Sequence, residues 1–486
     1  MSRVSSSEYL FYSPTGSLSL QVTIEELSDK VLLKIFRYFL DASPRYWIRL
    51  VHICHKWRRI VFEARQPLSL RLFCTHGTPV LKTLDFLPSL PIVVEYGGSP
   101  ALSPPTQKDG DNIVAALKRS ERVHSITLTV TSSLLKKLST LEGPFLELED
   151  LILSRDSAVP LTLPRTFRWG PRLRRLHLTS IAFPALLQLL SSSNLVDLRL
   201  HDVPNISHIS PETLMKPLSG MSRLRSFSLH FPAAAATYRA PSPPYEGHFV
   251  LPTLTRLYFR GITRYLEDLV AIIDAPQLED FEITHFDDPI SCHPKLCEFI
   301  NRMEMHKSHS RAQVSFSKDT VSISLMQPGG PAWLRLEICC KLSSIQLCFM
   351  ARICVEFSPF LLNVTDLRIS STGPEWPEMV YLGRWLEMLD SFSGVTRLHL
   401  DAKCLTNVTH ILLALERRPK NVLPALHKLY IPQAMHPATL TTSVVSFISS
   451  RHLSGHPITV EYELSVELCA TGPYVAVLSS TPANSF

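Results

Sequence analysis

The stretch LRRLHLT (residues 173–179) is followed 22 residues later by LVDLRLH (residues 195–201). Both follow the pattern apolar-x-x-apolar-x-apolar. Further copies start at Val123, Leu148, Leu224, Leu254, Leu278, Leu342, Val364, Val395 and Leu426, with an earlier copy at Leu87/Leu90/Ile92. Up to Leu278 the successive starts are 22 to 30 residues apart. A series with this period is typical of a repeat architecture in which each unit contributes one short strand.

The strand in each copy explains the pattern. Side chains alternate along a strand, so the last two apolar residues face the same side and are expected in the core. Helical patterns at residues 184–190, 265–273 and 409–416 predict segments that return on the other side. Burying three large side chains contributes about 6 kcal/mol, whereas ordering some 25 residues costs about 1–2 kcal/mol each. A single unit therefore cannot fold alone, but stacked units can.

The sequence thus predicts an α/β fold over residues 67–470, with parallel strands on a concave face and helices on a convex face. The period is lost over residues 284–341. There, residues 314–316 and 321–325 predict two strands around a turn at 317–320, as a hairpin or a distorted repeat. Pro-rich segments at 97–111 and 231–247 predict flexible loops. Residues 1–20 and 471–486 are predicted to be tails.

Residues 21–66 differ from the rest of the chain. Apolar residues recur at helical spacing in two stretches, separated by Ser43-Pro44. The first stretch runs from Ile24 to Phe39, and the second carries Trp47, Leu50, Val51, Cys54 and Trp57. The sequence therefore predicts a small all-α module before the strands.

This module resembles an F-box. The resemblance rests on Leu27, the pairs Val31-Leu32 and Ile35-Phe36, and Cys54-x-x-Trp57 in a later helix. The chain departs from the family with Ser28 where proline is usual and Lys30 where an acidic residue is common. The family docks onto the Skp-type adaptor of cullin-based ubiquitin ligases. The adaptor-binding residues that the resemblance implies are Leu27, Val31, Leu32, Ile35, Phe36, Leu50, Val51, Cys54 and Trp57.

The repeats are irregular. Where common leucine-rich repeats place Asn or Cys, this chain has Ile181, Val203, Ile262 and Phe286. The array resembles the degenerate leucine-rich-repeat-like solenoids attached to F-boxes, notably in fungal proteins. The alternative interpretation is an interaction scaffold without a ligase, whose N-terminal helices only cap the solenoid. Forty residues of helix bury too little apolar surface to stand alone, so either the solenoid or a partner must cover them.

Polar residues between the buried pairs form rows across neighbouring strands. The predicted rows are Arg175, Asp197, Ser226, Arg256, Asp280; then His177, Arg199, Ser228, Tyr258, Glu282; then Thr179, His201, His230, Arg260, Thr284. Arg, His and Tyr suit the binding of an acidic or phosphorylated protein segment. The candidate target-binding residues are His177, Arg199, His201, His230, Arg256, Tyr258 and Arg260. The alternative is an ordinary solvated polar face.

Other function classes find no support in the sequence. The 49 basic and 43 acidic residues are mixed along the chain, which does not predict nucleic-acid binding. No apolar run approaches the roughly 20 residues of a membrane helix, and residues 1–20 do not form a secretory signal. Nucleophile, phosphate-loop and dinucleotide motifs are absent. Cys292, His293, Cys297, His306 and His309 have the wrong spacing for a zinc finger, so no metal or cofactor is expected.

These observations predict a non-enzymatic adaptor in the cytoplasm or nucleus. Its F-box would bind a Skp-type adaptor, and through it a cullin, while its solenoid would recruit a target protein for ubiquitin-dependent degradation.

Overall fold

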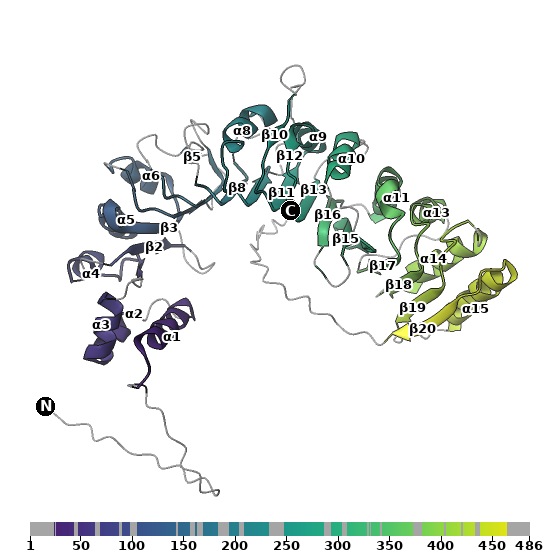
Figure 1. Cartoon of the computed structure of the whole chain (residues 1–486), viewed down its shortest axis with the longest axis horizontal. Coiled ribbons are helices and arrows are strands. Elements are labelled where there is room, and N and C mark those ends of the chain that lie inside the picture. The colour runs from purple at the N-terminus through teal and green to yellow at the C-terminus, as the bar shows by residue number, and fades with distance from the viewer. Residues whose placement is uncertain are drawn as a thin grey trace, which may run out of the picture.

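The computed structural model describes most of the chain between residues 24 and 463. The described residues are 24, 26–42, 47–63, 69–86, 90–97, 105–141, 144–155, 161–162, 169–182, 194–203, 209–232, 247–285, 293–303, 309–327, 330, 332–340, 343–372, 382–402, 405–418, 421–432 and 438–463. Within these ranges the protein is a mixed α/β structure with fourteen α-helices and one 16-stranded, mostly parallel sheet. The strands line the inner side of an arch and the helices its outer side (Figure 1).

The large sheet follows the order of the chain except near its middle. Its strands, in spatial order, are β1 (Leu70–Phe73), β2 (Ile92–Tyr96), β3 (Val123–Thr129), β4 (Asp150–Ser154), β6 (Arg175–Thr179), β8 (Asp197–His201), β9 (Ser226–His230), β11 (Arg256–Gly261), β13 (Asp280–His285), β16 (Ala332–Cys339), β15 (Thr320–Met326), β14 (Arg311–Phe316), β17 (Asp366–Ser371), β18 (Arg397–Ala402), β19 (Lys428–Pro432) and β20 (Thr459–Glu463). Two short parallel pairs lie apart from it: β5 (Leu161–Thr162) with β7 (Ile181–Ala182), and β10 (Phe249–Val250) with β12 (Ile273–Asp274).

The helices fall into two groups. At the N-terminal end lie α1 (Asp29–Ala42), α2 (Trp47–Ile53) and α3 (His55–Glu63). The helices that follow the strands are α4 (Val80–Phe86), α5 (Gln107–Leu117), the 3-10 turn η2 (Ser120–Arg122), α6 (Ser132–Leu138), α8 (Pro211–Leu218), α9 (Thr263–Ile272), α10 (Pro294–Arg302), α11 (Ser343–Glu356), α12 (Ser358–Leu361), α13 (Leu382–Asp390), α14 (Leu405–Arg417) and α15 (Ala438–Leu453). None of the described helices is long and apolar enough to cross a membrane.

The core lies between the sheet and the outer helices. In β8, for example, Leu198 and Leu200 are fully buried, whereas Asp197, Arg199 and His201 alternate with them on the other face. The strands predicted from the repeated pattern at Val123, Leu148, Leu173, Leu195, Leu224, Leu254, Leu278, Val364, Val395 and Leu426 are confirmed. The helices predicted at 265–273 and 409–416 are also confirmed, as α9 and α14, whereas residues 184–190 lie outside the described residues.

Two predicted copies of the pattern are wrong. At Leu342/Ile345/Leu347, the residues Ile345 and Leu347 belong to α11 and form no strand, while Leu342 lies outside the described residues. Buried residues there recur at helical spacing, at Leu347, Met350, Ala351 and Cys354, and this longer period decides the structure. The copy at Leu87/Leu90/Ile92 is misplaced: β2 begins at Ile92, and its buried Val94 and Tyr96 pair with Ile126 and Leu128 of β3.

The predicted irregular region is an antiparallel meander. Strands β14 and β15 pair antiparallel around the turn at Ser317, whose backbone N–H donates to the Thr320 carbonyl at 2.8 Å, which confirms the predicted hairpin. Strand β16 then pairs antiparallel with β15 and parallel with β13. On the far side β14 pairs with β17, so the meander is inserted in reversed order.

The Pro-rich segment 97–111 is only partly a loop. Helix α5 already begins at Gln107, because Thr106 and Asp109 form a capping box at its N-terminus. Most of 231–247, like the predicted tails at 1–20 and 471–486, lies outside the described residues.

Candidate functional site

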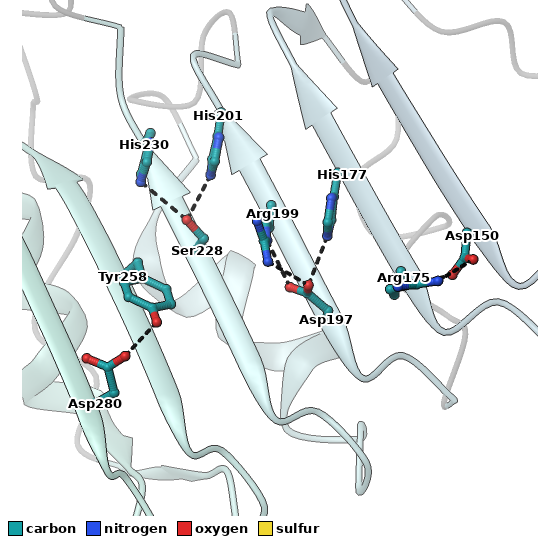
Figure 2. Close-up of polar contacts among 10 residues, drawn as sticks. All are labelled: Asp150, Arg175, His177, Asp197, Arg199, His201, Ser228, His230, Tyr258 and Asp280. Atoms are coloured by element: carbon teal, nitrogen blue, oxygen red, sulfur yellow. Dashed lines mark hydrogen bonds and ion pairs between the residues drawn. The ribbon is translucent and has the colours of Figure 1, made fainter. Parts of the chain in front are cut away.

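The three predicted rows exist as predicted on the inner face of the sheet. Strand pairing places Arg175 beside Asp197, His177 beside Arg199, and Thr179 beside His201. The rows continue through β9, β11 and β13 in the predicted register. The seven candidate target-binding residues therefore share one face, and Figure 2 shows most of them with their contacts.

Carboxylates hold two of the arginines in these rows. The Arg175 guanidinium makes a two-pronged contact with Asp150 on the neighbouring strand, with Nη2 at 2.5 Å from Oδ2. Asp197 accepts hydrogen bonds from Arg199, at 3.2 Å from Nε and 3.0 Å from Nη2, and lies 3.0 Å from His177 Nε2. Burial of Asp197 alone would raise its pKa, but the bonds from His177 and Arg199 lower that pKa to about 2. Asp197 is therefore a permanent anion that orients both side chains.

Two histidines on β8 and β9 are stacked. The rings of His201 and His230 lie parallel within 3°, with centroids 3.8 Å apart, and both contact the Ser228 hydroxyl (Figure 2). Burial, reinforced by Arg199, lowers the pKa of His201 to about 4. Burial and the neighbouring His201 and Arg260 lower the pKa of His230 to about 3. Both rings are uncharged at neutral pH.

The next strand adds a phenol and two exposed arginines. The Tyr258 hydroxyl donates a hydrogen bond to Asp280 at 2.5 Å, and burial together with Asp280 raises the pKa of this tyrosine. Arg256 and Arg260 flank Tyr258 on β11 and are exposed. The face consequently carries less net positive charge than its Arg and His content alone would give, because Asp150, Asp197 and Asp280 lie at the start of β4, β8 and β13.

A second cluster, on β14, β17 and β18, was not predicted. Asp366 lies 3.0 Å from Arg397, 3.6 Å from Arg311 and 3.3 Å from His399. The His399 ring stacks on Tyr430, with centroids 4.1 Å apart and planes within 6°. Extending the rows to the copies at Val364, Val395 and Leu426 would have revealed it.

The N-terminal helices place the predicted adaptor-binding residues in two groups. Leu32, Phe36, Leu50 and Val51 are buried inside the module, and the Phe36 ring lies 4.6 Å from that of Trp57. These four residues, which the F-box resemblance implies as adaptor-binding, make the module's own core in this structure. Leu27 and Trp57 pack partly buried against that core, and Cys54 is half-buried.

Four of the apolar residues that remain exposed lie on one stripe of α1, whereas Ile24 before α1 and Ile53 at the end of α2 are exposed outside it. Val31 and Ile35 are each 42% exposed, Phe39 is 37% exposed and Tyr38 is 81% exposed. Their spacing of four, three and one residues puts them on one side of the helix. Of these, Tyr38 and Phe39 were missed as site residues, although the helical period of the sequence includes Phe39.

Polar contacts elsewhere hold the three helices together. Lys56 Nζ donates to the Leu27 carbonyl at 2.9 Å, and Arg58 Nε donates to the Val51 carbonyl at 2.9 Å. Arg59 lies 3.5 Å from Asp29. The module therefore closes on itself without using the stripe on α1.

Among the residues that the structure places, no group of three or more His, Cys, Asp or Glu side chains is arranged to hold a metal ion. No family model matches the sequence, and no curated protein resembles it significantly.

Proposed function

We propose that the chain is a substrate-recruiting subunit of a cullin-RING ubiquitin ligase. Helices α1–α3 dock a Skp-type adaptor, and the inner face of the sheet holds the target protein. The observation that carries this proposal is the uncovered apolar stripe of Val31, Ile35, Tyr38 and Phe39 beside a complete helical core.

The stripe lies outside the buried core of the module. Leu32 and Phe36, one position further round α1, already supply its core contacts. Large apolar side chains grouped on one exposed face mark interaction surfaces, because covering each contributes about 1.5–3 kcal/mol. The F-box resemblance at Leu27, Val31-Leu32, Ile35-Phe36 and Cys54-x-x-Trp57 gives the partner its identity.

Charge supports a partner of acidic character. Residues 24–63 contain eight basic and five acidic side chains, and Lys30 and Lys34 on α1 are exposed next to the stripe. An acidic rim on the adaptor would complement them and speed association.

We further propose that the arch is a degenerate leucine-rich-repeat-like solenoid. One strand per unit on the inner face, followed in most of the described units by a helix on the outer face, agrees with that architecture (Figure 1). The seven candidate target-binding residues would recognise an acidic or phosphorylated segment. The chain itself performs no chemistry and acts by raising the concentration of the target near the ligase-bound ubiquitin.

Affinity purification of the full chain from cells tests the proposal. We expect a Skp-type adaptor and a cullin at near-equal amounts with the chain. Recovery of other proteins without any adaptor or cullin would instead favour an interaction scaffold whose helices α1–α3 only cap the sheet.

A further inference from the structure

A compact patch of hydrogen-bond donors lies on β8, β9 and β11. Strand pairing puts His201, His230 and Arg260 side by side in one row, and Arg199, Ser228 and Tyr258 side by side in the next. We call these six residues the imidazole patch. The carboxylates Asp197 and Asp280 lie in the third row, on the far side of Arg199 and Tyr258, where they already accept hydrogen bonds.

One hydroxyl serves both rings of the patch. Ser228 Oγ lies 2.8 Å from His201 Nε2 and 3.3 Å from His230 Nε2. A hydroxyl has one proton to donate and two lone pairs to accept with. With both rings neutral, Ser228 can donate to one ring while it accepts from the other, so the two rings take opposite tautomers.

The same geometry has room for one more proton. If the accepting ring gains a proton on Nε2, Ser228 can accept from both rings, and no side chain has to move. Burial opposes this proton first, and the positive charges nearby oppose it further. The charged and titratable groups that face the two rings are His177 on β6, Arg199 and Asp197 on β8, and Arg260 on β11. Asp197 is committed to His177 and Arg199, so the rings face mostly positive neighbours.

A bound anion would offset the positive charge around the two rings and supply the charged pair with a counterion. It would attract Arg199 and Arg260, and it would also favour the protonated form of the ring pair between them. We propose that the imidazole patch binds a phosphate monoester on the target protein and takes up a proton as it does so. A doubly charged tetrahedral group is favoured over a carboxylate because two guanidinium groups and one imidazolium can then act on it together. This inference rests on the proposed function in one respect only, namely that the bound group belongs to a recruited target.

Sulfate is a suitable probe because it is a tetrahedral dianion with no titratable proton near neutral pH. Any proton taken up on binding must then come to the protein. We would titrate the full chain with sulfate by calorimetry, in two buffers that differ in protonation enthalpy, between about pH 7.5 and about pH 5.5. Acetate tests whether a simple carboxylate binds as well as sulfate. Two peptides that carry phosphoserine or glutamate at the same position make the same comparison for a protein segment.

We expect sulfate affinity to rise as the pH falls, by up to about tenfold for each pH unit, with close to one proton taken up. Acetate and the glutamate peptide should bind at least about tenfold more weakly than sulfate and the phosphoserine peptide. The double variant His201→Asn with His230→Asn should lose the pH dependence, and Arg199→Gln with Arg260→Gln should lose binding. His399→Gln, which changes the stacked ring beside Asp366, is the matched control and should behave as the unaltered chain.

A second measurement does not depend on the folding of any variant. Without sulfate, the imidazole NMR signals of His201 and His230 in the unaltered chain should keep the chemical shifts of neutral rings down to pH 6. With sulfate, the protonation of the ring pair should be seen at higher pH. Sulfate affinity that is flat with pH, or equal binding of acetate, would overturn the proposal. The sulfate and NMR measurements use the chain alone, whereas the affinity purification tests its partners. Failure of one proposal can therefore be told from failure of the other.

Discussion

The imidazole Nδ1 of His293 lies 2.9 Å from Oε2 of Glu356 and links two segments that are 63 residues apart. The same carboxylate accepts the backbone N–H of His293 at 3.2 Å. His293 precedes α10, and Glu356 is the last residue of α11, so the contact joins helices on the two sides of the meander. Glu267 from α9 accepts the N–H groups of Lys295 and Leu296, and the two carboxylates together satisfy the start of α10.

Replacing Glu356 with alanine should lower the free energy of unfolding by about 2–4 kcal/mol, because His293 would remain buried without its partner. Glu356→Gln keeps an acceptor and should cost less. Glu298→Ala removes an exposed pair with Lys295 and is the control, with an expected loss of under about 1 kcal/mol. Denaturant unfolding measures all three, and equal losses for Glu356→Ala and Glu298→Ala would contradict the assigned contact.

Charges placed on the α1 stripe should separate partner binding from folding. Val31→Asp with Ile35→Asp should abolish co-purification of the Skp-type adaptor, since each charge would enter an apolar interface at a cost of several kcal/mol. The melting temperature should change little because both residues are exposed. Leu81→Asp places the same charge at an exposed apolar residue of α4, outside the stripe, and should retain the adaptor. Wild-type recovery of the adaptor with the double variant would show that the docking surface lies elsewhere.

The register of the sheet can be tested at Leu198. Leu198→Ala removes a fully buried side chain and should destabilise the chain by about 2–5 kcal/mol. Leu413→Ala is the matched substitution on α14, where the side chain is 41% exposed, and should cost well under half as much. Thermal or denaturant unfolding gives both values, and similar losses would argue against the burial of Leu198.

Acid should destabilise the fold through its buried histidines. Complete burial lowers the pKa of His285 to about 3, well below its ordinary value of 6.5. The unfolded chain therefore binds more protons below pH 6.5. Stability from this group is complete above that pH and is lost as the pH falls toward 3, by at most about 1.4 kcal/mol per pH unit.

His201 and His230 act with the same sign, because their pKa values are also lowered. The free energy of unfolding should decline from pH 7 to pH 5. Its slope with pH should correspond to the uptake of up to three protons on unfolding. In a His285→Asn variant that slope should be smaller by about one proton, and an unchanged slope would show that His285 is protonated in the folded chain.

The strands and rows could be predicted from the sequence because alternation and period are local signals. Leu198 and Leu200 face the core by the same rule that places Arg199 between them, so the register of the rows followed from the pattern alone. The segment around Leu347 was assigned wrongly because three of its apolar residues match the strand pattern locally, whereas the helical spacing becomes visible only over the longer run from Leu347 to Cys354.

The candidate sites were harder to predict than the fold. Which face of α1 packs on Trp57 depends on contacts between helices, so Leu32 and Phe36 could not be told from Val31 and Ile35 by sequence spacing. How far Asp197 neutralises the charge of Arg199 depends on the conformations of these two side chains on β8. The register of the rows does not determine those conformations.

The reversed order of the meander has a consequence for synthesis on the ribosome. Strands up to β13 can add one after another as the nascent chain emerges, each pairing with the strand made just before it. The edge of β13 then stays unpaired for longer, because its partner β16 begins only at Ala332, after β14 and β15 have been synthesised. β14 in turn provides the edge on which β17 assembles. A chain stalled before Cys339 would leave β13 exposed as an open strand edge, so chaperones that shield such edges should bind nascent chains of that length.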